Sequence, residues 1–170
     1  LPPGLINVVS GGDELGAELT NHKGIDKIVF TGSIATGKKV MASASNSVTP
    51  VTLELGGNDA GIMLQGTDPA QFAEGLFFGS MINSGQTCGA LKRLFVHEDV
   101  LDATVAALTG FAANIQMGDG MDENSILGPL QNDRQFKRVI ELVEDAKANG
   151  GTCVTGGEPT GGPNYFYPVT

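Results

Sequence analysis

The chain has 170 residues, of which 41% are hydrophobic, enough to form the core of one domain or of a tightly joined pair. Ten basic and nineteen acidic residues give a net charge of −9, which makes nucleic acid and anionic membrane surfaces poor candidate partners. No apolar run approaches the roughly 20 residues of a membrane span. Two cysteines in unlike settings and two histidines exclude a disulfide framework and a cysteine/histidine zinc site. We therefore expect a cytoplasmic, globular α/β protein without a metal.

The first part of the chain, residues 1–57, alternates short β-branched runs with helical stretches and has glycines at the turns. This alternation predicts right-handed βαβ crossovers and a parallel sheet, which would be half of a Rossmann-like dinucleotide fold. The expected elements are strands at 6–9, 27–30 and 51–55 and helices at 14–21 and 34–44.

The turn Thr31-Gly32-Ser33 joins a predicted strand to the helix that follows it. Its free N–H groups and the positive end of the helix dipole would face an anion such as a pyrophosphate. Gly37 falls inside this helix, where the missing side chain would let helix and strand approach closely. The pattern G-x-G-x-x-G is absent, so by spacing alone a plain helix start with a serine cap is the favoured interpretation.

The second part, residues 58–170, is expected to continue with further helices and strands. The helix predicted at 69–82 is apolar on most faces, which indicates that it is buried and that its phenylalanines belong to the core. Cys153 lies in a β-type run, and we expect it to be buried and inert. The last apolar run, 165–168, should pack against chain beyond these residues. Other expected elements are a strand at 94–96, helices around 100–115 and 136–143, and a turn-rich loop at 117–132.

Cys88 lies between small and polar residues in the segment 83–90 (NSGQTCGA), directly after the apolar helix. Such residues let the backbone approach a ligand and leave its N–H groups free to stabilise an anion, as nucleophilic catalysis by a thiol requires. Free cysteines are more often small core residues, but flanking glycines argue against that interpretation. The segment alone leaves the two possibilities equal.

Glu54 interrupts a β-type run in the segment 51–57 (VTLELGG), which ends on two glycines. A carboxylate is costly to bury, and partial desolvation at the end of a strand would suit Glu54 to proton transfer at neutral pH. A glutamate that faces water from an edge strand is equally compatible with this segment alone.

Together these segments resemble the aldehyde dehydrogenase superfamily. The segment 51–57 resembles its glutamate signature and 83–88 its cysteine signature, and 30–33 (FTGS) and 127–130 (LGPL) fit the same family in register. The resemblance covers essentially the whole chain. Because members of the family are far longer and the chain begins without methionine in a predicted loop, we expect an internal piece of a longer protein. Residues 1–57 would be part of its NAD(P)-binding domain and 58–170 part of its catalytic domain.

The resemblance implies oxidation of a small-molecule aldehyde to a carboxylic acid through a thioester on Cys88, with Glu54 activating the hydrolytic water. NAD or NADP would be the cofactor, and the complete protein would be a homodimer or homotetramer. The family's ribose contacts and the asparagine of its oxyanion hole lie outside this chain, and Gly89 is smaller than the residue common at its position. The 170 residues alone should therefore lack dehydrogenase activity. The residues expected to contact the cofactor are Thr31, Gly32, Ser33, Gly37, Leu55 and Gly56.

Two other functions stay open at this stage. A cysteine hydrolase would pair Cys88 with a histidine base, but His22 and His97 are more simply explained as solvated side chains. A scaffold without catalytic activity is the more serious alternative. The sequence does not distinguish NAD from NADP or identify the aldehyde.

Overall fold

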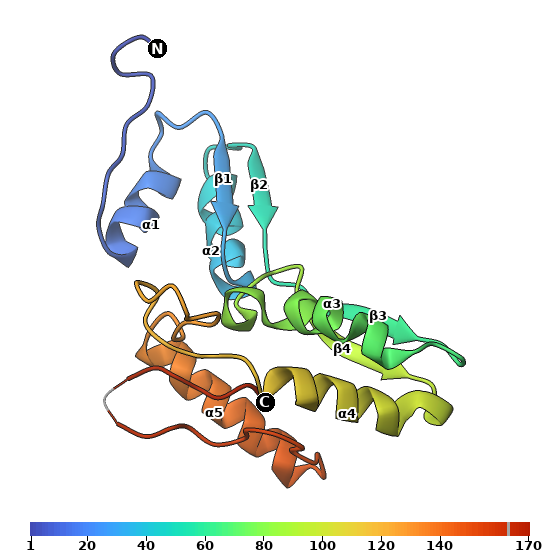
Figure 1. Cartoon of the computed structure of the whole chain (residues 1–170). Coiled ribbons are helices and arrows are strands. Elements are labelled where there is room, and N and C mark those ends of the chain that lie inside the picture. Colours follow the sequence, from blue (N-terminus) through green and yellow to red (C-terminus); the bar gives the residue numbers. More distant parts are fainter. Residues whose placement is uncertain (163) are drawn as a thin grey trace. The chain divides into compact units, whose positions relative to one another are not determined.

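The computed structural model describes residues 1–162 and 164–170. The chain divides into two compact units, Leu1–Gly56 and Gly57–Thr170. Each unit combines helices with a two-stranded parallel sheet, as Figure 1 shows. The α/β class and the parallel strands predicted from the sequence are thereby confirmed.

The first unit is built from two helices and two strands. β1 (Ile28–Thr31) and β2 (Val51–Glu54) pair in parallel, and the helix α2 (Ile34–Ser45) connects them. The remaining helix is α1 (Asp13–Asn21). Since a parallel pair needs a crossover, α2 is the crossover that the alternating pattern predicts.

The core of the first unit lies between α2 and the sheet. Ile28 on β1 and Val40 and Ala44 on α2 are buried together. Val40 and Ala44 are four residues apart and therefore lie on one helix face, which packs against the strand. Four half-buried apolar residues surround this cluster: Ile25, Phe30, Val51 and Leu53.

The strand predicted at 6–9 does not form. Ile6, Val8 and Val9 are exposed, and the segment 6–9 has no regular structure. The prediction rested on β-branched residues, but a strand also needs a neighbour to which its backbone groups can bond. In the described part of the first unit, the only strand pair is β1 with β2.

The second unit has a second parallel pair covered by helices. β3 (Asp59–Met63) pairs with β4 (Leu91–Val96), with a register irregularity between Asp59 and Ala60. The rings of Phe77 and Phe78 on one helix lie 5.2 and 6.0 Å from the ring of Phe111 on another. The helices of this unit are α3 (Pro69–Met81), α4 (Leu101–Ala112) and α5 (Asp133–Ala148), with short 3-10 turns η1 (Ile82–Gly85) and η2 (Glu98–Val100).

Three expectations for the second unit were wrong in part. Helix α3 buries Pro69, Ala73 and Phe77, whereas Phe72 is exposed, so the helix is covered on one face and not on most. Cys153 is exposed and lies outside any strand, because the glycines before it lead into an irregular segment. Tyr167 is buried within the unit, and its ring lies 6.3 Å from the ring of Phe136 on α5.

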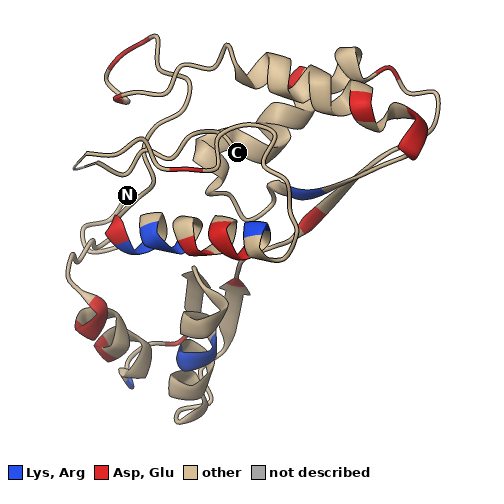
Figure 2. Cartoon of the chain, turned by 90° about the horizontal axis from the view of Figure 1, so that it is seen from below, with Lys and Arg blue, Asp and Glu red and all other residues tan. Residues whose placement is uncertain are grey.

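Acidic residues outnumber basic ones along most of the chain, and α5 carries both signs along its length (Figure 2). Its exposed ion pairs join residues one helical turn apart, such as Lys137 with Asp133 at 2.7 Å. In the described residues, no helix is long and apolar enough to span a membrane. The same residues contain no group of three His, Cys, Asp or Glu that could hold a metal ion.

Candidate functional site

The predicted cofactor turn and Glu54 come together at the carboxyl ends of β1 and β2. Thr31 and Glu54 are the last residues of the two strands and lie opposite each other in register. The Gly32 N–H donates a hydrogen bond of 3.0 Å to the Glu54 carbonyl oxygen. The backbone of the turn is therefore attached to the backbone of Glu54. Ligands of open parallel sheets bind at this end of the strands.

The Glu54 side chain is exposed within its own unit. The segment alone left partial burial and exposure to water equally open, and the residues of the first unit leave Glu54 exposed. The Gly32 N–H was expected to be free for an anion, but it is used by the Glu54 carbonyl.

The first turn of α2 nevertheless offers free donors. Ser33 is its N-cap, and its Oγ accepts a hydrogen bond of 3.1 Å from the Thr36 N–H. Among the described residues, nothing accepts a hydrogen bond from the N–H groups of Ser33, Ile34 or Ala35. Helix starts with such unsatisfied donors and a positive dipole end bind phosphate groups well.

Gly37 allows the close approach that the sequence predicted. It is buried in α2, and a Cβ at this position would lie 2.7 Å from Leu55 Cδ2. Leu55 follows β2 directly, so the glycine brings the first turns of α2 against the end of that strand. Gly56, the last residue of the unit, is exposed, and a Cβ at this position would have no atom within 4 Å.

Cys88 lies in the second unit, on the loop between α3 and β4, and its side chain is exposed. The loop begins with three consecutive residues in the left-handed region, Asn83 (φ 53°), Ser84 (φ 56°) and Gly85 (φ 74°). A serine in this region is strained, and such strain persists only where the surroundings fix the backbone. The chain thereby reverses direction within a few residues after α3.

Long-range hydrogen bonds hold this loop. Ser84 Oγ donates to the Gly128 carbonyl at 2.8 Å, and the Gln131 N–H donates to Gln86 Oε1 at 2.9 Å. Both partners lie in or beside the LGPL segment, which the sequence identified only through the family resemblance. Local sequence patterns did not reveal these partners, which are more than forty positions away in the chain.

Two further residues contact the backbone of Cys88 itself. Lys92 Nζ donates hydrogen bonds to the carbonyl oxygens of Thr87, Cys88 and Ala90, at 2.9, 2.9 and 3.0 Å. Gly57, which lies just before β3, comes close to the same backbone, and a Cβ at this residue would lie 2.5 Å from the Cys88 carbonyl oxygen. The Cys88 N–H donates to no acceptor among the described residues. It is thus free to bind the oxyanion that would form if the thiol added to a carbonyl group.

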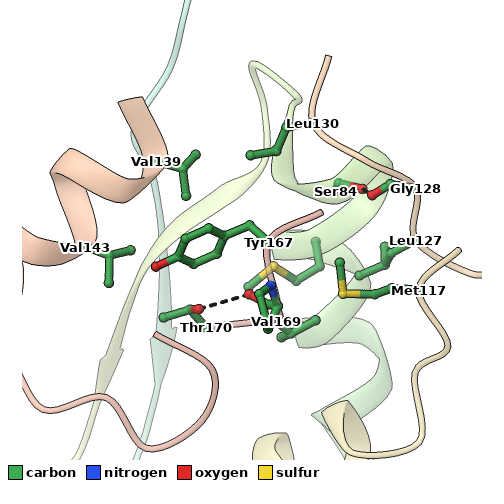
Figure 3. Close-up of a pocket in the computed structure, with 12 residues that line it drawn as sticks. Ser84, Met117, Leu127, Gly128, Leu130, Val139, Val143, Tyr167, Val169 and Thr170 are labelled. Atoms are coloured by element: carbon green, nitrogen blue, oxygen red, sulfur yellow. Dashed lines mark hydrogen bonds between the residues drawn. The ribbon is translucent and has the colours of Figure 1, made fainter. Parts of the chain in front are cut away.

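The second unit also has a cavity of about 240 Å³ between α5, the LGPL segment and the chain's last residues (Figure 3). Its walls are mostly apolar, and Tyr167 extends across it between Val139, Val143 and Thr170. Ser84 lines this cavity but Cys88 does not. The thiol of Cys88 therefore lies outside this cavity.

The model of the aldehyde dehydrogenase family matches residues 1–170. The chain belongs to this family. It is 41% identical over its whole length to a probable aldehyde dehydrogenase from Pseudomonas sp., of which it covers 35%. Other curated relatives have chloroplastic and peroxisomal names, so family membership does not fix the compartment.

Solved structures agree with this result. A succinate-semialdehyde dehydrogenase from Burkholderia pseudomallei superposes with a TM-score of 0.92 at 36% identity, over 99% of this chain and 35% of that one. An aldehyde dehydrogenase from Bacillus cereus, in its NAD⁺ complex, gives 0.85 at 40% identity, over 90% of this chain and 31% of that one. The chain thus spans about a third of the length of the relatives it matches.

Proposed function

We propose that this chain carries the nucleophile and the general base of an NAD(P)-dependent aldehyde dehydrogenase, with Cys88 and Glu54 in those roles. The observation that carries the proposal is the loop of Cys88. It presents an exposed thiol next to its own free N–H group, on a backbone that Ser84, Gln86 and Lys92 hold in place. A fixed backbone donor beside a nucleophile is the arrangement that carbonyl addition requires.

The reaction begins at the thiol. The Cys88 thiolate attacks the aldehyde carbon, a C–S bond forms, and the carbonyl oxygen becomes an oxyanion that the Cys88 N–H stabilises. Bound NAD(P) would supply the acceptor for the hydride of this carbon, and Cys88 would then hold the remaining acyl group as a thioester. The aldehyde is thereby oxidised by two electrons.

Glu54 then takes part in hydrolysis. Its carboxylate removes a proton from water, which attacks the thioester carbonyl, so that the C–S bond breaks and a carboxylic acid and the thiol are released. The carboxylate is exposed in the first unit, as access to water requires. It can also assist deprotonation of Cys88 before the attack.

The first unit fits a dinucleotide at one point. The free N–H groups of Ser33, Ile34 and Ala35 suit the pyrophosphate. Thr31 and Gly32 shape the turn, Gly37 allows its close packing, and Leu55 and Gly56 would border the nicotinamide. This assignment makes 1–57 part of a cofactor domain and 58–170 part of a catalytic domain. The NAD⁺ complex of the Bacillus cereus relative supports the choice of cofactor.

The complete protein is proposed to be a cytoplasmic homodimer or homotetramer that acts on a small aldehyde.

A cysteine hydrolase gains no support. His97 Nδ1 lies 3.6 Å from Asp99 Oδ2 and accepts a hydrogen bond from the Asp99 N–H, so this histidine belongs to a local turn after β4.

The proposal is tested with Cys88→Ala in the complete protein. Aldehyde-dependent formation of NADH should be abolished, while NAD affinity, followed by a thermal shift on titration, should stay within about threefold of wild type. A variant that keeps a tenth of the wild-type rate would remove Cys88 from the mechanism. Equal NAD affinity together with no activity in either protein would favour a scaffold.

A further inference from the structure

We propose that Lys92 is a positioning residue for the oxyanion site, and that it fixes the direction of the Cys88 N–H through the carbonyl oxygen of Thr87. This inference rests on the proposed role of Cys88 as nucleophile. It adds a residue that lies outside the cysteine signature and takes no part in the chemical steps above.

The first argument is the planarity of the peptide bond. The Thr87 carbonyl and the Cys88 N–H belong to one peptide group, which is planar and trans, so the two bonds point in opposite directions. Lys92 Nζ holds the Thr87 oxygen at 2.9 Å. Fixing this oxygen therefore fixes the direction of the N–H on the other side of the plane.

The second argument is the number of bonds. An ammonium group has three donors, and Lys92 uses all three on the carbonyl oxygens of Thr87, Cys88 and Ala90. Two consecutive peptide planes, one on each side of the Cys88 Cα, are thereby held by the same charged group. The Cys88 oxygen also lies close to Gly57, because a Cβ at that residue would be only 2.5 Å from it.

The third argument is polarisation. A positive charge on a carbonyl oxygen draws electron density through the amide and makes the N–H of that group a stronger donor. The hydrogen bond to the Thr87 oxygen thus acts on the donor that faces the oxyanion. Without the ammonium, the Cys88 N–H should no longer be held in one direction, and it should be a weaker hydrogen-bond donor. Removal of one such donor costs about 10²- to 10³-fold in rate, and misdirection should cost part of that.

The experiment compares two reactions of Cys88 in the complete protein. Acylation by p-nitrophenyl acetate forms a C–S bond through an oxyanion and releases p-nitrophenolate, whereas alkylation by iodoacetamide displaces iodide at a saturated carbon. Only the first reaction needs the N–H, and neither needs NAD. Both rates are measured for wild type, Lys92→Met and Lys137→Met. The last is a matched control, since Lys137 pairs with Asp133 on the exposed face of α5.

Lys92→Met should lower the acylation rate by about 10- to 100-fold and change the alkylation rate by less than about threefold, and Lys137→Met should change neither. Equal losses in both reactions, no loss in either, or a wild-type protein that is alkylated but never acylated would each overturn the proposal. If Lys92→Met does not fold, Lys92→Arg takes its place. The donors of a guanidinium lie in one plane, so they cannot reach all three carbonyl oxygens as the single ammonium nitrogen does. The ratio of acylation to alkylation in Lys92→Arg should fall at least threefold, and a ratio within twofold of wild type would overturn the proposal. Failure of the dehydrogenase assay alone leaves this result intact.

Discussion

The carbonyl oxygen of Cys88 lies against Gly57, so closely that a Cβ at residue 57 would be 2.5 Å from it. Gly57 ends the segment that carries Glu54, and Cys88 is the proposed nucleophile. The second glycine of VTLELGG thus has a structural reason of its own. It leaves room for the backbone of the cysteine loop.

Gly57→Ala should therefore lower both the stability of the protein and its proposed activity. The new methyl group would meet the Cys88 oxygen and Asp59 Oδ1 at 2.8 Å, and a backbone atom cannot move away as a flexible side chain can. We expect a loss of about 1–3 kcal/mol in the free energy of unfolding and a fall in NADH formation of at least about tenfold. Gly79→Ala on α3 is the control, because a Cβ there has no atom within 4 Å. Equal effects of both substitutions would contradict the prediction.

Glu54→Gln should separate the two halves of the reaction. The amide keeps the shape of the side chain but cannot remove a proton from water, so the thioester on Cys88 should accumulate. Intact-mass measurement after addition of aldehyde and NAD should show the added acyl group. Normal steady-state turnover without that adduct would leave Glu54 a structural residue.

Val48 should be a site at which the protein can be stabilised. It follows α2 with φ 55°, a conformation that is costly for a β-branched residue, and its side chain is 86% exposed. Asparagine tolerates this region, so Val48→Asn should raise the free energy of unfolding by about 1 kcal/mol. Val8, 88% exposed and without a positive φ, is the control. Chemical denaturation should show no gain for Val8→Asn, and a gain of similar size there would refute the strain argument.

Tyr167 should make stability depend on alkaline pH. Burial raises the pKa of its phenol, and its hydroxyl has no hydrogen-bond partner among the described residues. Above about pH 10 the unfolded chain loses this proton while the folded protein retains it, so the free energy of unfolding should fall as pH rises. Tyr167→Phe should reduce that fall and leave stability at pH 7 unchanged or higher.

Tyr165→Phe is the control for this measurement, because Tyr165 is 40% exposed. Denaturation curves at pH 7 and pH 10.5 for the three proteins provide the comparison. A loss of more than about 1 kcal/mol in Tyr167→Phe at pH 7 would mean that the hydroxyl has a partner.

The hydrophobic pattern of each segment was enough to predict the elements of the βαβ unit. The alternation around β1, α2 and β2 was sufficient, because each segment carries its own hydrophobic period and the crossover follows from parallel pairing. The close approach at Gly37 was also predictable, since a glycine inside a helix that follows a strand directly allows helix and strand to pack closely.

Contacts distant in the chain were not predictable. The run 6–9 has the composition of a strand but finds no strand neighbour among the described residues. Cys153 resembles a core residue by composition, but the segment around it is irregular and exposed. The role of Lys92 had no signal at all, because its partners are backbone oxygens, whose direction depends on the path of the loop.

The bond from Ser84 to Gly128 spans 44 residues and has a consequence for synthesis on the ribosome. At about 5–20 residues per second, the thiol leaves the ribosome roughly 2–9 s before the segment that shapes its loop. During this interval, the nascent chain carries Cys88 without the loop backbone on which its proposed catalytic role depends. Closure of this long loop is entropically costly and comes late. If Cys88 is the nucleophile as proposed, the protein should react with carbonyl compounds only after most of this unit has been synthesised.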